Sequence, residues 1–460
     1  MPPVLALFLT VGFIVFLFRR ESREKVQVSR ALWIPVIWLF LTGSRFASQW
    51  MSLSAYAGAG SVADGSPLDA LVFLTLIVAG VNVLKQRHVT YSEFLRNNRW
   101  LTIFFIYSLI SIVWSDFPFI AAKRWIKVVG HPVMVLIILT DAHPQQAVRT
   151  LFKRLAYLLI PLSILFIKYF PQYGRGFDAW SGDPVNCGVA LTKNELGCIC
   201  WIFGVFFFWN LLQALKMKPS KARRAELLLS AGFLLMDFWL LQMASSATSM
   251  LVMMLGMAII LALGFRFVNK RLVGAYVVLG IVALVVAEPI FGIYATVVHS
   301  MGRNLTLTDR TDVWQLALQL QPNPLLGSGF ESFWLGTRLE KLWAKFWWQP
   351  LQAHNGYIET YLNLGWAGIA LLIGQIVDTF RKICAGLTKQ FEFARLRMGF
   401  LFAILVYNYT EAAFVAVAFA WTIFFLIAVD YPAPRRARSK EAPGSAGDDK
   451  REAAPVLAGT

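Results

Sequence analysis

Long runs of apolar residues recur from one end of the chain to the other, and they restrict its fold more than any other feature. A helix of about 20 apolar residues crosses the hydrocarbon core of a bilayer, where every backbone polar group has to be bonded within the protein. The runs therefore predict an all-α fold, a polytopic transmembrane helical bundle with about 12–13 spans. The thirteen candidate spans are residues 2–18, 31–47, 68–84, 100–116, 126–140, 154–170, 196–214, 226–243, 247–265, 272–290, 360–379, 396–410 and 412–429.

Composition supports this class and excludes several others. Hydrophobic residues make up 57% of the chain and charged residues 15%, whereas a soluble domain carries about 25% charge. Disorder, a coiled coil and a disulfide-rich secreted module are excluded together. The four cysteines form no C-x-x-C pair, so neither a zinc site nor a disulfide framework is indicated. Residues 2–18 lack a charged leading region, and we interpret them as a first span, not a cleavable signal peptide.

The net charge of +17 is explained by its placement along the chain. Alternate segments between the spans hold 29 basic residues, and the intervening segments hold ten. Basic residues accumulate on the cytoplasmic side of a membrane protein, so the charge indicates topology and not nucleic-acid binding. The bias predicts an outer N-terminus, a cytoplasmic C-terminus, and a position of segments 171–195 and 291–359 on the outer face of the cytoplasmic membrane.

The chain divides into two parts. Residues 1–430 form a transmembrane domain that includes the outer loop 291–359. Residues 431–460 are rich in Pro, Ala, Gly and charge, and we predict a disordered cytoplasmic tail. We find no internal repeat and no inverted pair of broken helices, the feature that marks many secondary transporters.

The outer loop 291–359 has the pattern of an ordered segment. Asp309 is placed to cap a helix whose apolar stripe includes Val313 and Ala317, and residues 339–349 have the pattern of a second short helix. By periodicity alone, these are amphipathic helices lying on the membrane surface. An interfacial belt is the simplest explanation for most of the aromatic side chains between 330 and 348.

The polar residues of the outer segments indicate chemistry. Arg310 and His354 are candidate catalytic residues, since a guanidinium suits phosphate oxygens and an imidazole accepts a proton near neutral pH. The candidate substrate-binding residues are Arg175, Lys193, Arg303 and Asn355. Each has a simpler explanation if taken alone: a histidine that caps a helix, an arginine at a lipid headgroup, a lysine that starts a helix. The small polar stretch 244–249 favours close helix packing first and a substrate groove second.

Four motifs in order give the chain a resemblance to a known family. Lys193-Asn194-Glu195-Leu196-Gly197 comes first, followed by a block from Gly302-Arg303 to Val313-Trp314, by Pro324 to Phe330, and by His354-Asn355-Gly356-Tyr357. In this order they resemble the O-antigen ligase/polymerase superfamily, and most closely its exopolysaccharide-polymerase branch. Asp309 departs from the pattern, in which a glycine precedes the arginine.

The resemblance implies a glycosyl-transfer enzyme that acts without metal or other cofactor on undecaprenyl-pyrophosphate-linked oligosaccharide. It implies that Arg310 holds the pyrophosphate, that His354 lies near the acceptor, and that Arg175 contributes from the earlier segment. A flippase and a chain-length regulator are the implied protein partners, beside the lipid bilayer.

Three functions remain open from the sequence. The first is polymerisation of lipid-linked repeat units in exopolysaccharide or O-antigen synthesis, and the second is ligation of finished glycan to lipid A-core or to protein. The third is a lipid-linked sugar transporter, for which ionisable residues inside several spans would be the sign. Asp237 is the main residue of that kind.

Overall fold

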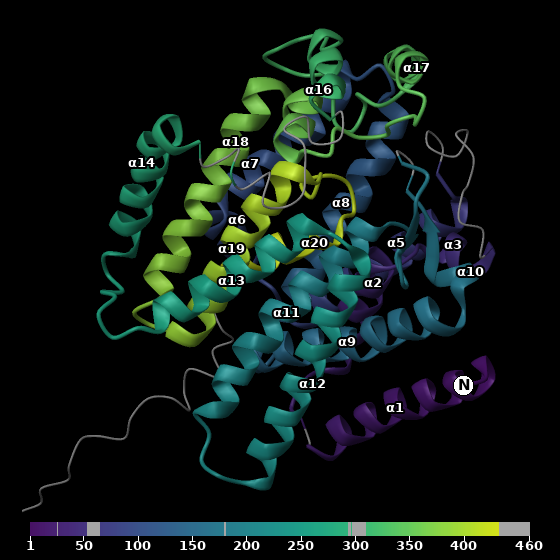
Figure 1. Cartoon of the computed structure of the whole chain (residues 1–460). Coiled ribbons are helices and arrows are strands. Elements are labelled where there is room, and N and C mark those ends of the chain that lie inside the picture. The colour runs from purple at the N-terminus through teal and green to yellow at the C-terminus, as the bar shows by residue number, and fades with distance from the viewer. Residues whose placement is uncertain (25, 53–64, 179–180, 293–295, 297–309, 432–460) are drawn as a thin grey trace, which may run out of the picture.

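The computed structural model describes residues 1–24, 26–52, 65–178, 181–292, 296 and 310–431. Nearly all of the regular structure in this part of the chain is helical, and the long helices form one bundle (Figure 1). The helices are α1 (Pro3–Arg23), α2 (Trp33–Gly43), α3 (Ala47–Ser52), α5 (Pro67–Gln86), α6 (Tyr91–Asn97), α7 (Arg99–Ile110), α8 (Pro118–Leu139), α9 (Pro144–Tyr169), α10 (Pro171–Gly174), α11 (Lys193–Leu215), α12 (Lys221–Ala244), α13 (Ala247–Gly264), α14 (Val273–Phe291), α16 (Arg310–Gln319), α17 (Gly336–Lys345), α18 (Gly356–Gly386), α19 (Phe391–Thr410) and α20 (Phe419–Ala428). Short 3-10 turns cover Arg30–Leu32 and Ser111–Trp114, and the strands β1 (Arg175–Phe177) and β2 (Pro184–Asn186) pair antiparallel.

Every predicted span overlaps a helix, and eight of the described helices are long and apolar enough to cross a membrane. The prediction of a polytopic all-α bundle is therefore confirmed. Several boundaries differ from the prediction; α8, for example, begins at Pro118 and α9 at Pro144. Arg45 lies beyond α2, which ends at Gly43, and the last span starts at Phe419 because residues 411–418 are not helical.

The non-helical segment after α19 has a local cause. The side-chain oxygen of Asn408 accepts hydrogen bonds from the backbone N–H of Ala413 and of Phe414, both at 3.0 Å. An asparagine side chain that bonds the backbone in this way competes with helical bonding and turns the chain. Residues 411–418 consequently form a loop at the end of the bundle that carries α16 and α17.

Helices α9 and α11 form the centre of the bundle. Helix α11 packs against α12, α13 and α19, and α9 packs against α1, α2 and α12. Helices α1 and α14 lie at the periphery and expose most of their side chains, as lipid-facing helices do. Asp237 on α12 is fully buried within this packing, so it faces protein and not an open groove.

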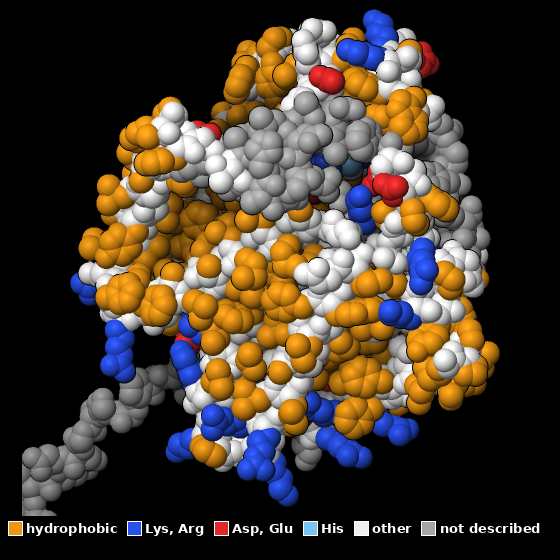
Figure 2. Space-filling model, viewed as in Figure 1, with side chains coloured by type: hydrophobic (Ala, Val, Ile, Leu, Met, Phe, Trp, Pro, Cys, Tyr) orange, Lys and Arg blue, Asp and Glu red, His pale blue; other side chains and the backbone are white. Residues whose placement is uncertain are grey.

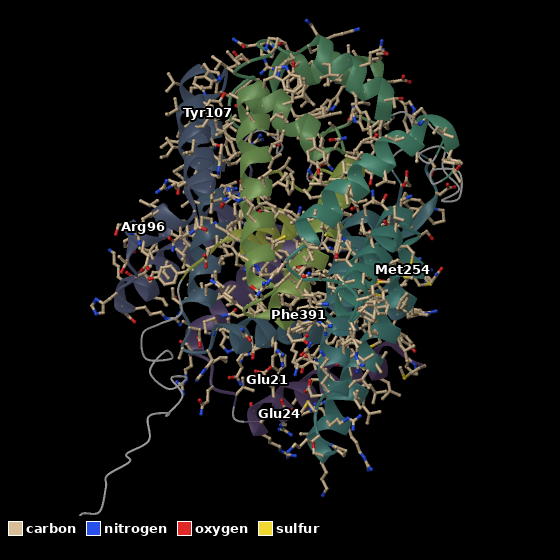
Figure 3. The ribbon with its side chains drawn as sticks, turned by 90° about the vertical axis from the view of Figure 1, so that its left-hand side faces the viewer. Glu21, Glu24, Arg96, Tyr107, Met254 and Phe391 are labelled. Atoms are coloured by element: carbon tan, nitrogen blue, oxygen red, sulfur yellow. The ribbon has the colours of Figure 1, made fainter. Side chains whose placement is uncertain are left out.

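The two ends of the bundle differ in charge. Figure 2 shows Lys and Arg side chains gathered at its lower end, opposite the end where α16 and α17 lie in Figure 1. In Figure 3, Glu21 and Glu24 lie at this lower end, and Tyr107 lies near the other end. The separation agrees with the charge bias in the sequence, whose assignment to a cytoplasmic and an outer side stays a prediction.

Helix α18 is broken near its start, at Gly365, where φ is 63°. The loop 324–329 enters this break and bonds its backbone: Ser328 and Gly329 donate to the carbonyls of Leu362 and Asn363, at 3.1 and 2.9 Å. On the other side of the break, the N–H groups of Trp366 and Ala367 donate to the loop. The Tyr107 hydroxyl, labelled in Figure 3, donates to the Leu364 carbonyl at 3.0 Å. These bonds satisfy backbone groups that the break leaves without helical partners.

Helices α16 and α17 pack on each other and on the start of α18. Their apolar side chains form a small core of their own, around Val313, Ala317, Leu339 and Leu342. The interpretation as helices lying flat on a membrane surface is therefore wrong, because their apolar faces are covered by protein. Several aromatic residues predicted as an interfacial belt belong to this core, namely Phe333, Trp334 and Phe346.

We expect the contact between the loop 324–329 and the break in α18 to leave no room for a side chain at Gly327. A Cβ at Gly327 would overlap the Asn363 carbonyl, and the φ of Gly327 is +76°. Gly327→Ala should lower the free energy of unfolding by about 2 kcal/mol or more through strain and overpacking. The measurement is the midpoint of thermal unfolding of the purified protein in detergent. Gly280→Ala on α14 is the control, since a Cβ there meets no atom within 4 Å, and equal midpoints for the two variants would contradict the account.

Candidate functional site

The carboxylate of Glu411 joins residues from distant parts of the chain. Its Oε1 accepts hydrogen bonds from Arg310 Nη2 at 3.1 Å and from Asn194 Nδ2 at 2.7 Å. Its Oε2 lies 3.3 Å from His354 Nδ1. The two predicted catalytic residues are therefore brought together, although neither touches the other.

Glu411 is placed by the end of α19. It directly follows Thr410, and its N–H donates to the Tyr407 carbonyl at 3.0 Å. The start of α18 is fastened to the same segment, since the Asn355 amide donates to the Tyr409 carbonyl at 2.9 Å. A Cβ at Gly356 would overlap the Asn408 side chain, so the two segments approach as closely as the missing side chain permits. The histidine loop and the glutamate loop thus form one unit.

His354 has a defined orientation. Its φ is 51°, and its half-buried side chain directs Nδ1 to Glu411, with Gln352 Nε2 at the longer distance of 3.5 Å. An ionised carboxylate has no proton to donate, so Nδ1 carries the proton and Nε2 carries the lone pair. No hydrogen bond of Nε2 is made to the described residues. A neutral His354 can therefore accept a proton at Nε2 from a bound hydroxyl.

Arg310 is the first residue of α16, and its guanidinium bonds both Glu411 and the Thr410 carbonyl. Its contact with Glu411 is shielded, because the exposed fractions of the two side chains are 16% and 11%. Burial acts to raise the pKa of the Glu411 carboxyl, but Arg310 and His354 outweigh it, so that this pKa lies below its ordinary value. Glu411 is consequently an anion at neutral pH.

Lys193 and Arg175 lie on the neighbouring segment 171–195. Lys193 begins α11, where Thr192 and Glu195 form a capping box, and its Nζ pairs with Asp178 at 2.5 Å. Arg175 lies on β1, and its Nε donates to the Ile167 carbonyl at 3.0 Å. The next residue after Lys193 is Asn194, which bonds Glu411. The segment therefore reaches the centre through Asn194, and Arg175 is held on the hairpin beside it.

Arg303 and Asn355 are the other two predicted substrate-binding residues. Arg303 lies outside the described residues, as does Asp309 with its predicted capping role. Asn355 is the N-cap of α18, and its side chain is engaged by the N–H groups of Tyr357 and Ile358 and by the Tyr409 carbonyl. That position gives Asn355 a structural role, and substrate binding by Arg175, Lys193, Arg303 and Asn355 stays a prediction.

The stretch 244–249 also reaches the centre. The Thr410 hydroxyl donates to Thr248 at 2.9 Å. A Cβ at Gly197 on α11 would overlap Ser249, so α11 and α13 pack closely at this point. The interpretation of the stretch as a site of close helix packing is confirmed.

Two carboxyl groups, those of the buried Glu359 and of the half-buried Glu331, hold the loops of the site. Glu359 accepts hydrogen bonds from the Ala353 N–H and from Trp334 Nε1, the latter at 2.8 Å. Glu331 accepts from the Ala416 N–H at 2.6 Å. Between the two acids lies a cavity of about 20 Å³, which has room for one water and none for a sugar. These two acids therefore order the loops of His354 and Glu411.

Glu411 and Asn194 belong to the centre formed with Arg310 and His354, and neither was predicted from the sequence. The predicted spans 396–410 and 412–429 leave Glu411 between them, far along the chain from the other motifs. A signal was present, because Asn408, Thr410 and Glu411 make this span end unusually polar. Nothing in that pattern identifies Arg310 and His354 as its partners.

Comparison with known protein families supports the resemblance. Residues 231–373 match the O-antigen ligase family. The matched region contains Arg310, His354 and the break in α18, and it confirms the resemblance to the O-antigen ligase/polymerase superfamily. None of the curated proteins matches the chain.

The lowered pKa of Glu411 predicts a pH-dependent difference in stability between wild type and Glu411→Gln. A carboxyl with a lower pKa in the folded state stabilises the fold above its unfolded pKa, and this contribution is lost as pH falls through the folded pKa. The thermal midpoint of wild type should exceed that of Glu411→Gln at neutral pH. The difference should narrow as pH falls below the ordinary value of 4.5. A difference that stays constant from pH 7 to pH 3 would contradict the charge pairing.

Proposed function

We propose that the chain polymerises lipid-linked oligosaccharide repeat units. The match of residues 231–373 to the O-antigen ligase family supports this proposal. The substrates would be undecaprenyl-pyrophosphate-linked oligosaccharides of exopolysaccharide or O-antigen synthesis. The reaction would take place at the outer face of the cytoplasmic membrane, in contact with the lipid bilayer. A flippase that delivers the repeat units and a chain-length regulator are the partners this function requires.

The observation that carries the proposal is the shared carboxylate of Glu411. It holds a permanent cation, Arg310, and a histidine whose Nε2 is a free acceptor among the described residues. A cation that contacts a departing pyrophosphate stabilises the negative charge that the transition state gathers there. A base that contacts the attacking hydroxyl removes its proton. The two requirements of glycosyl transfer from a pyrophosphate are thus supplied a few ångströms apart.

The proposed step balances without a further reactant. The bond between the donor's anomeric carbon and its pyrophosphate oxygen breaks, and a bond forms from that carbon to the acceptor's hydroxyl oxygen. The hydroxyl proton passes to His354 Nε2, and the lipid pyrophosphate leaves with the bonding electrons. Arg310 binds the pyrophosphate in this scheme, and Glu411 stabilises the imidazolium that forms.

Ligation of finished glycan is the second candidate, because the family matched by residues 231–373 is described as O-antigen ligase. Polymerase and ligase share the donor and its chemistry and differ in the acceptor. The order of the motifs from Lys193 to Tyr357 favours the polymerase branch. Lipid extracts separate the two: loss of a polymerase accumulates single lipid-linked repeats, and loss of a ligase accumulates long lipid-linked chains.

The proposed function predicts that the purified protein forms glycan. Purified wild-type protein with a synthetic polyprenyl-pyrophosphate oligosaccharide and EDTA should produce a ladder of products on a gel. Arg310→Ala and His354→Ala should each reduce the rate by about 10²- to 10⁴-fold, since each removes one stabilising group of the transition state.

The controls replace residues of the same type away from the centre. Arg266→Ala and His143→Ala change exposed side chains and should leave the ladder unchanged. A wild type that forms no new bond would contradict the enzyme proposal and favour transport. Variants of Arg310 and His354 with full activity would contradict the site.

We expect the contact with Glu411 to set the tautomer of His354. In Glu411→Gln, the amide can donate to His354 Nδ1, which places the proton on Nε2 and removes the base. We expect a rate reduced by about 10²-fold or more, with a smaller loss in Glu411→Asp. The measurement is the initial rate of transfer at saturating donor. Equal activity of Glu411→Gln and wild type would show that Glu411 does not set the tautomer.

A further inference from the structure

Three basic residues lie at the outer end of α8, apart from the Glu411 centre. Lys123, Arg124 and Lys127 occupy about one turn of this helix, on the side of the membrane where the charge bias of the sequence gives no reason to expect them. The Arg124 guanidinium donates to the Glu331 carbonyl. Glu331 in turn accepts from Ala416 in the loop that begins with Glu411. The basic turn of α8 is therefore connected to the catalytic loop through two contacts.

The charge of this turn is only partly compensated. Asp69 is the carboxylate that acts on Lys127 most strongly, but both of its oxygens accept hydrogen bonds from Ser48, at 2.8 and 2.7 Å. Among the described residues, Lys127 and Lys123 form no ion pair. Lys123 lies over the ring of Phe119, 4.8 Å from its centroid. Among the described residues, one carboxylate, that of Asp69, therefore stands near three basic side chains, and neither ammonium group is held in an ion pair.

The surroundings of the basic turn match a lipid with a charged head. The exposed fraction of Phe119 is 74% and that of Ile126 is 48%, and Val113 nearby is exposed to 84%. Exposed apolar side chains of this kind suit hydrocarbon, and lysines beside them suit its polar edge. A polyprenyl chain would lie along the apolar side chains, and its pyrophosphate would meet Lys123 and Lys127.

The proposed polymerisation requires a second site of this kind. The donor loses its pyrophosphate at Arg310, but the acceptor keeps its own lipid pyrophosphate throughout the transfer. With the acceptor hydroxyl at His354, its pyrophosphate lies one repeat unit away from the catalytic centre. We propose that Lys123 and Lys127 bind the pyrophosphate of the acceptor lipid, an inference that rests on the proposed polymerase function. Arg124 positions this turn of α8 against the catalytic loop.

The test is the number of lipid pyrophosphates that the protein binds. Full-length protein in phosphatidylcholine nanodiscs is titrated with undecaprenyl pyrophosphate and examined by native mass spectrometry. Wild type should bind two copies. The double variant Lys123→Gln/Lys127→Gln should retain one copy and bind the second about tenfold or more weakly, through loss of charged hydrogen bonds. Arg310→Ala should lose the other copy.

The controls separate this site from general effects of charge. Lys341→Gln removes an exposed lysine of α17 and should still bind two copies. Retention of the first copy by the double variant shows that it is folded. One copy bound by wild type, or unchanged binding by the double variant, would overturn the proposal. Displacement of the second copy by phosphatidylglycerol would overturn it too, since the lysines would then bind any anionic headgroup.

A transfer assay distinguishes failure of this site from failure of the polymerase proposal. The double variant should raise the KM for a lipid-linked acceptor about tenfold and leave the KM for the same oligosaccharide without lipid pyrophosphate unchanged. An equal rise for both acceptors would contradict the site. A wild type that binds two copies and makes no new bond would contradict polymerisation and leave the pyrophosphate site standing.

Discussion

The carboxylate of Glu411 is the interaction on which the candidate site depends. It is bonded by Asn194 at the start of α11, by Arg310 at the start of α16 and by His354 just before α18. Without an anion at this position, a guanidinium and an imidazole would face each other in a shielded setting, which costs free energy. One side chain therefore neutralises the cation, orients the histidine and joins the segment 171–195 to the large loop that carries α16 and α17.

The broken helix α18 supplies the frame for this centre. Hydrocarbon requires continuous helical bonding, yet a bend with free backbone groups is tolerated where other protein bonds them. The loop 324–329 meets that requirement at Gly365, and Glu359 on the same helix holds the histidine loop. Helices α16 and α17 then bury their apolar faces against each other and against the start of α18. The broken helix α18 thus supports both the histidine loop and the helices α16 and α17.

Much of the fold could be predicted from the sequence, because apolar length and basic bias act locally and every span contributes its own signal. Arg310 and His354 could be named for the same reason, since polar groups at an outer surface stand out from their surroundings. Glu411 could not be connected with them, because their contact depends on how α16, α18 and α19 pack. The sequence predicts helix over 412–418, where the structure has a loop, because the apolar residues of this segment outweigh the single side chain, Asn408, that ends α19.

The central claim is that Arg310 and His354 act as one centre held by Glu411, and a structure with bound substrate tests it most directly. The measurement is an electron cryomicroscopy map of the protein in nanodiscs with an undecaprenyl-pyrophosphate oligosaccharide. The account predicts a pyrophosphate bonded by Arg310, a sugar next to His354 Nε2, and Glu411 in contact with both residues. A pyrophosphate bound away from Arg310, or a Glu411 carboxylate separated from His354, would contradict it.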